Sequence, residues 1–67
     1  MTKAEALNLA NQIGLNLPKT KCVDALFDLC EKRGYKLGLE ETMKNGRATY
    51  STWVIWDANN KEIARCD

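Results

Sequence analysis

The side chains that could do chemistry are few and scattered. The 67 residues contain no histidine, which removes the commonest general base and metal ligand. Glu40 and Glu41 are adjacent, and successive residues of a strand point to opposite faces, so these two carboxylates cannot act as a paired acid and base. We therefore expect a protein that is not an enzyme and that needs no metal or cofactor.

Three cysteines, Cys22, Cys30 and Cys66, lack the C-x-x-C spacing of a zinc half-site. Cys22 and Cys30 fall on one expected helix, about 12 Å apart at 1.5 Å per residue, which exceeds the ~7 Å that a disulfide spans. We interpret all three as reduced thiols. The first residues show no signal-peptide pattern, and no apolar run approaches the roughly 20 residues of a membrane span. These features predict a cytoplasmic protein without a membrane segment.

A binding surface is the remaining possibility, and it depends on the stretch 49–56. This stretch holds both tryptophans, one of the two tyrosines and several β-branched residues, which are types that favour strands. The turn signals Asn45-Gly46 and Asn59-Asn60 flank it. A strand with a hairpin on each side is the middle strand of an antiparallel meander.

Two helices are expected before this meander. Thr2 and Glu5 have the capping-box spacing, so the first helix should cover residues 3–13 and stop at Gly14. The second should begin near Thr20, or alternatively at Pro18, and stop before residue 34. Its apolar residues recur at helical spacing and should face the core, namely Val23, Leu26, Phe27 and Cys30.

Strand pairing decides which side chains the helices cover. A two-residue turn at Asn45-Gly46 pairs Leu37 with Val54, and a three-residue loop at 58–60 pairs Val54 with Ala64. A two-residue second loop is the alternative, and it would exchange the two faces of the last strand. The core face then carries Tyr35, Leu37, Leu39, Thr52, Val54, Trp56, Ala64 and Cys66. The whole chain, residues 1–67, should form one α+β domain in which two N-terminal helices pack on one face of a three-stranded antiparallel meander (ααβββ).

In this register the opposite face of the sheet is uncovered. It carries Trp53, Ile55 and Ile63, with Arg65 and Lys36 around them. An exposed apolar patch with Trp and Arg is typical of a contact site, although basic side-chain stems can also shield a tryptophan on an ordinary surface. We predict a small regulatory module that binds another protein or a second copy of itself. Small accessory proteins of phages and mobile elements have this size and this lack of catalytic residues.

Nucleic-acid binding is the alternative. Tyr50 or Trp53 could stack on a base, while Lys44 and Arg47, at the tip of the first hairpin, hold phosphates. Ten basic and nine acidic residues give a net charge of only +1, however, and nucleic-acid-binding domains usually carry a strongly basic face. The sequence therefore favours protein binding.

Overall fold

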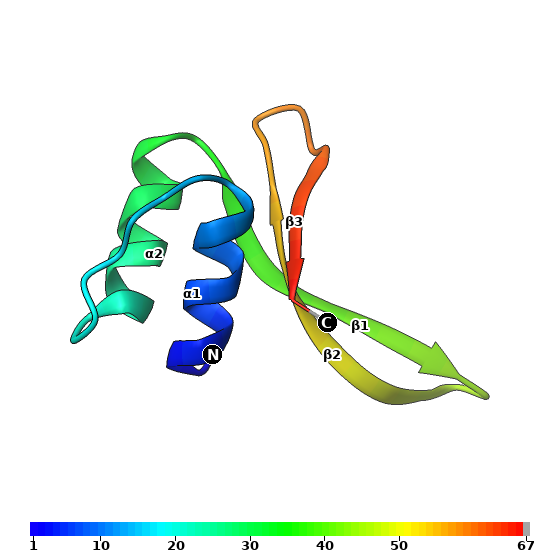
Figure 1. The fold of residues 1–67 in the computed structure, drawn as a ribbon. Coiled ribbons are helices and arrows are strands. Elements are labelled where there is room, and N and C mark those ends of the chain that lie inside the picture. Colours follow the sequence, from blue (N-terminus) through cyan, green and yellow to red (C-terminus); the bar gives the residue numbers. More distant parts are fainter. Residues whose placement is uncertain (67) are drawn as a thin grey trace.

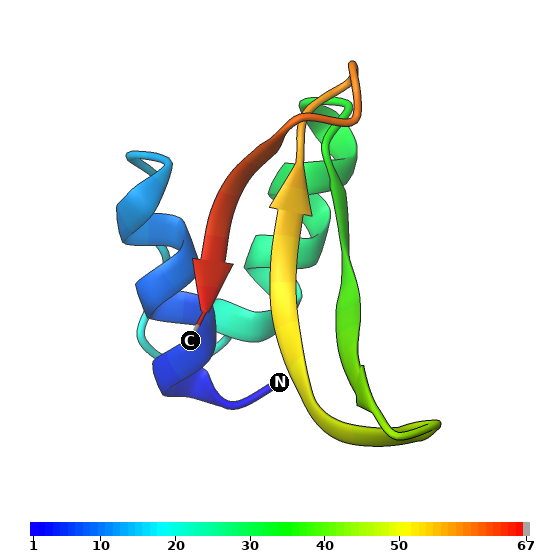
Figure 2. The same cartoon turned by 90° about the vertical axis from the view of Figure 1, so that its right-hand side faces the viewer.

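The computed structural model describes residues 1–66, and the side chains of residues 42, 44 and 48–50 lie outside that description. Two helices precede three strands: α1 (Lys3–Gln12), α2 (Cys22–Lys32), β1 (Lys36–Lys44), β2 (Arg47–Trp56) and β3 (Glu62–Cys66). The strands form one antiparallel sheet in the order β1-β2-β3. Both helices lie on one side of it (Figures 1 and 2). The predicted ααβββ architecture is confirmed.

Helix α1 begins as its sequence predicts, and the predicted glycine follows its end. The Glu5 amide donates to Oγ1 of Thr2 over 3.2 Å, and the Thr2 amide donates to Oε1 of Glu5 over 2.9 Å, which completes the capping box. Gly14 follows the helix with a φ of 72°, a left-handed conformation that glycine adopts without a steric cost. The helix ends one residue earlier than the expected range of 3–13.

Helix α2 begins later than expected. Lys21 is its N-cap and provides no side-chain hydrogen bond, so neither Thr20 nor Pro18 starts the helix and that prediction was wrong. The end is as predicted, with Gly34 at a φ of 74°. The buried face of α2 carries Leu26 and Cys30 as predicted, but Phe27 is exposed, and the prediction was wrong for that residue.

The core lies between the two helices and the sheet face that they cover, called here the inner face. Leu9 of α1, Leu26 of α2 and Ile55 of β2 are its largest fully buried members on this side. Helix α1 packs against α2 and against β3, and α2 also contacts β1. The part of the β1–β2 hairpin around its Asn45-Gly46 turn, called here the arm, extends beyond both helices (Figure 1).

The first hairpin has the predicted turn but not the predicted register. Asn45 and Gly46 both have positive φ, 53° and 78°, as the two-residue turn requires, and Lys44 pairs with Arg47. A bulge then inserts one extra residue into β2, since Met43 pairs with Ala48 but the next pair joins residues 42 and 50. Beyond the bulge every partner is displaced by one residue.

The second hairpin behaves in the same way. Oδ1 of Asp57 accepts hydrogen bonds from the amides of Asn59 and Lys61, and Trp56 pairs with Glu62 as a three-residue loop predicts. A second bulge follows, so Ile55 pairs with Ala64 rather than with residue 63.

The bulges reverse the predicted orientation of β2. Leu37 now pairs with Ile55 and Leu39 with Trp53, so the odd-numbered side chains of this part of β2 share the inner face. Val54 belongs to the opposite face, called here the outer face, as do Thr52 and Trp56. The prediction was therefore wrong for β2, because a one-residue slip moves each side chain to the other side of a sheet.

Candidate functional site

The structure does not bring the predicted contact residues together on one surface. Ile55 has an exposed fraction of 0% and belongs to the core, and Ile63 packs against the same core. Trp53 is half-buried on the inner face. The outer face carries only Arg65 and Lys36 of this group, so the predicted uncovered patch is replaced by two separate features.

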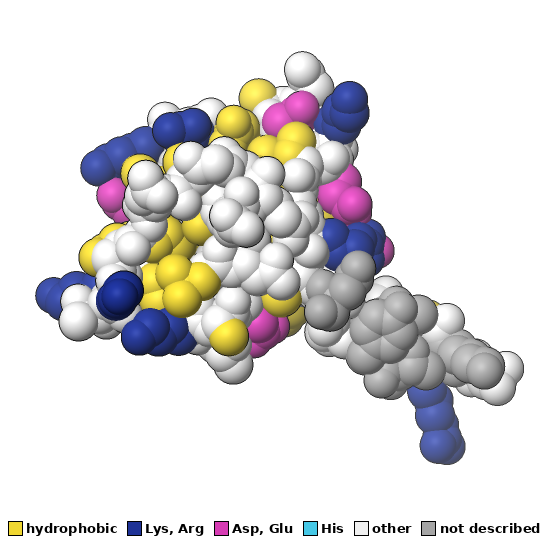
Figure 3. All heavy atoms as spheres, in the orientation of Figure 1, with side chains coloured by type: hydrophobic (Ala, Val, Ile, Leu, Met, Phe, Trp, Pro, Cys, Tyr) yellow, Lys and Arg dark blue, Asp and Glu magenta, His cyan; other side chains and the backbone are white. Residues whose placement is uncertain are grey.

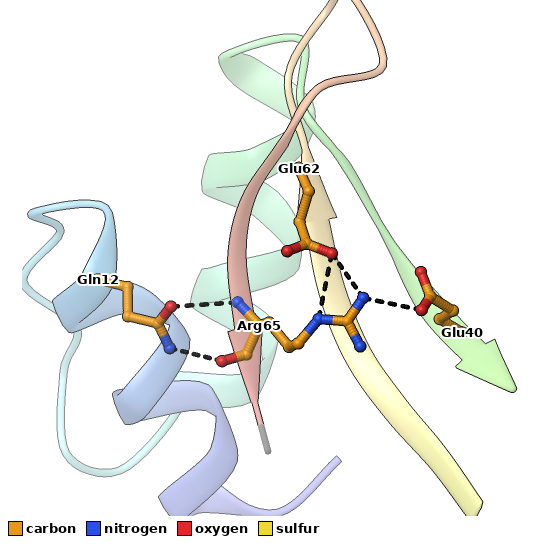
Figure 4. Close-up of polar contacts among 4 residues, drawn as sticks. All are labelled: Gln12, Glu40, Glu62 and Arg65. Atoms are coloured by element: carbon orange, nitrogen blue, oxygen red, sulfur yellow. Dashed lines mark hydrogen bonds and ion pairs between the residues drawn. The ribbon is translucent and has the colours of Figure 1, made fainter. Parts of the chain in front are cut away.

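The first feature is a network of charges on the outer face, centred on Arg65 (Figure 4). Its Nη2 lies 2.8 Å from Oε1 of Glu40 and 2.6 Å from Oε1 of Glu62, and its Nε donates to the same Glu62 oxygen over 3.1 Å. Hydrogen bonds to Glu62 and then to Glu40 raise the pKa of Arg65 above its ordinary value. Because Arg65 is on β3 and Glu40 is on β1, the side chain must cross β2, where Val54 is Arg65's direct partner. Val54 has an exposed fraction of 0% there.

The main chain of Arg65 is also held from the other side, at the outer edge of β3. The amide group of the Gln12 side chain donates to the Arg65 carbonyl over 2.7 Å and accepts from the Arg65 N–H over 3.1 Å (Figure 4). This pair of bonds occupies the positions that a further strand would use. Helix α1 thereby closes part of this edge of the sheet.

Next to the charge network, the ring of Trp56 lies over part of β1 on the outer face. Cζ3 of Trp56 lies 3.5 Å from the position that a Cβ atom would take at Gly38. Lys36, the direct partner of Trp56, donates from Nζ to Oδ1 of Asn60 over 2.7 Å. The ring of Trp56 therefore lies close to the backbone of an otherwise bare stretch of β1.

The second feature is an exposed apolar surface between α2 and the arm, called here the aromatic corner: Phe27, Leu39, Met43 and Trp53. Phe27 and Trp53 meet edge to face, with ring centroids 6.0 Å apart and planes at 86°. Leu39 is the direct strand partner of Trp53. The exposed fractions are 42% for Phe27, 49% for Leu39 and 59% for Met43. Apolar spacing in the sequence predicts both Phe27 and Leu39 in the core, and that prediction was wrong because both are exposed.

The residues of the nucleic-acid alternative lie on the arm. Arg47 is exposed next to the turn, whereas the side chains of Lys44 and Tyr50 are outside the described residues. Figure 3 shows basic side chains spread around the rim of the face that it draws, with acidic ones between them. Binding of nucleic acid stays a prediction, and a gel shift that weakens steeply with salt would support it.

No cluster of three potential metal ligands occurs among the described residues. Neither of the two helices in that part of the chain has the length and apolar character needed to cross a membrane. Comparisons of the chain with protein-family models, with curated proteins and with solved structures gave no match.

Proposed function

We propose that this chain is a small non-enzymatic module that binds another protein through its aromatic corner. The observation that supports this most is the exposure of Phe27 and Leu39 beside a half-buried Trp53, with Met43 exposed further along β1, in a chain of only 67 residues. So small a domain has little apolar surface beyond what its core requires. Apolar side chains left together in water then usually mark a contact site.

The geometry of the aromatic corner suits an anchor for a partner. Phe27 comes from α2 and Leu39 from β1, so two elements border Trp53, and the ring of Phe27 restricts its movement. Aromatic side chains that are held in place lose little entropy on binding, which is why Trp is enriched among the residues that contribute most to interfaces. Met43 extends the apolar surface along the arm and adapts to irregular partners.

A regulatory role in the cytoplasm is part of this proposal. It is supported by the small size, the three reduced thiols and the lack of a recognisable catalytic group in the sequence. Small accessory proteins of phages and mobile elements share this small size and this lack of catalytic residues.

The experiment compares lysine substitutions at matched exposed apolar positions. Immobilised wild-type protein should capture a defined partner from a lysate of the source organism, and Phe27→Lys and Met43→Lys should each reduce that capture at least tenfold. Leu7→Lys on α1, whose exposed fraction is 37%, is the control and should retain capture. Equal capture by all four proteins, each shown to be folded by circular dichroism, would contradict the proposal.

A further inference from the structure

The two edges of the sheet differ in how their main-chain groups are bonded. Gln12 covers the outer edge of β3, as described above. On β1, no described residue donates to or accepts from the main-chain groups that point away from β2, and Figure 2 shows no element beside that edge. A nine-residue edge strand of this kind is a template for another strand, and soluble proteins usually protect such an edge.

We propose that β1 pairs antiparallel with β1 of a second copy, with Gly38 opposite Gly38 of the second copy. Two three-stranded sheets would then form one six-stranded sheet with all four helices on the same side. The contact uses the edge, the outer face at Lys36 and Glu40, and Leu39 of the aromatic corner. It does not use Phe27 or Met43, the two residues whose substitution tests binding of another protein.

The charges of β1 select this register. Side chains on the same face must meet across the twofold axis, so the axis passes through a residue of β1. An axis at Gly38 places Lys36 opposite Glu40 of the second copy, and this opposite-charge pair occurs twice. An axis at Glu40 would instead place Glu40 opposite its own copy, and like charges in direct opposition are destabilising.

Other registers differ from this one in which apolar side chains they place opposite each other. An axis at Gly38 also places Leu37 opposite Leu39 of the second copy, again twice, and so covers the 49% of Leu39 that is exposed. An axis at Leu39 places Leu37 opposite Glu41 of the second copy. An axis at residue 42 sets Met43 against Glu41 of the second copy. Only the axis at Gly38 combines both charge pairs with both leucine pairs.

The structure around Gly38 fits the close approach of a second strand. Because Gly38 has no side chain and Trp56 lies over its backbone, the two Trp56 rings would flank the axis on the outer face. Glu40 already accepts from Arg65 through Oε1, and a carboxylate has lone pairs for a further cation, here Lys36 of the second copy. The charge network of each outer face would thus extend across the axis.

Reversal of single charges tests the proposed contact by sedimentation velocity between about 10 µM and 1 mM, a range suited to a small interface. The wild-type chain should sediment as a dimer of twice the 7.6 kDa chain mass. Lys36→Glu should weaken the dimer at least tenfold, because it sets two glutamates against each other on both sides of the axis. Glu40→Lys should do the same with lysines. An equimolar mixture of the two variants should restore a dimer, since each pair across the axis then joins opposite charges.

The proposal is overturned if the wild-type chain stays a monomer throughout this range, or if Lys36→Glu leaves the dimer unchanged. Glu40→Lys also removes an ion pair with Arg65, so thermal unfolding must show that it folds. Should it not fold, Leu39→Lys provides the second test, because it places a charge opposite Leu37 of the second copy without touching Arg65. Phe27→Lys and Met43→Lys should leave the dimer intact, which separates this contact from binding of another protein at those two side chains.

Discussion

Replacement of Ile55 by alanine distinguishes the observed strand register from the one that the sequence suggests. In the structure Ile55 is fully buried beneath the helices, where it pairs with Leu37 on one side and Ala64 on the other. In the register without bulges the same side chain would stand on the uncovered face of the sheet. The two arrangements therefore predict very different losses of stability for one substitution.

The expected loss follows from the burial of Ile55. The change to alanine removes three buried carbons at about 0.8 kcal/mol each, or ~2.4 kcal/mol. The cavity that remains adds to this, so Ile55→Ala should lower the free energy of unfolding by about 2–5 kcal/mol. A chain of this length has a total stability of roughly 3–10 kcal/mol. Ile55→Val should cost only about 0.5–1.5 kcal/mol and should leave a measurable folded state.

Urea unfolding followed by circular dichroism measures these differences. With a slope of about 1 kcal/mol per molar urea, Ile55→Val should move the midpoint down by roughly 0.5–1.5 M, and Ile55→Ala should move it further or abolish the transition. Met43→Ala is the control, and its exposed side chain should change the stability by less than about 0.5 kcal/mol. A loss below about 0.5 kcal/mol for Ile55→Ala would refute the register and the assignment of the inner face.

Three further predictions test local features. Gln12→Ala should lower the free energy of unfolding in urea by about 1 kcal/mol, because the edge of β3 loses both hydrogen bonds. It should also speed hydrogen exchange of the Arg65 amide, and an unchanged exchange rate would argue against this edge contact. Hydrogen bonds from Thr2 lower the pKa of Glu5, so its contribution to stability is present above about pH 4.3 and is lost as the pH falls through the folded-state pKa. Thermal melts between pH 7 and 3 should therefore depend less on pH in Glu5→Gln than in the wild type. Burial raises the pKa of the Cys30 thiol, and the nearby charge of Arg33 opposes this with a smaller effect. The reaction of Cys30 with a disulfide reagent at pH 8 should therefore accelerate when urea is added. A fast reaction in native buffer would contradict the burial of Cys30.

Local signals in the sequence were sufficient for the ends of most elements. The capping box at Thr2 and Glu5, the left-handed glycines 14 and 34 and the turn at Asn45-Gly46 each act through their own backbone or a neighbour three residues away. Such interactions can be predicted from a short window. The N-terminus of α2 is the exception, because Lys21 provides no capping side chain and nothing in the local sequence marks that residue.

The orientation of β2 could not be predicted in this way. Both faces of the strand are apolar, with Trp53 and Ile55 on one and Val54 and Trp56 on the other, so alternation does not show which face is inner. The two bulges decide it, and neither occurs at a glycine that would mark it in the sequence. Arg65 and Lys36 were correctly placed on the face away from the helices, but Trp53 and Ile55 were not.

Val54 shows why the outer face needs no third layer. A central strand of a two-layer domain normally has one face in water, yet Val54 is as completely buried as Ile55. Arg65 buries Val54, because its side chain reaches from β3 across β2 to Glu40 on β1. The stem of a long basic side chain covers apolar surface while its charged end remains paired. Side chains of the same chain therefore cover the outer face of β2. Among the described residues, the edge of β1 and the aromatic corner have no such cover, and contacts with other chains should be sought at these two places.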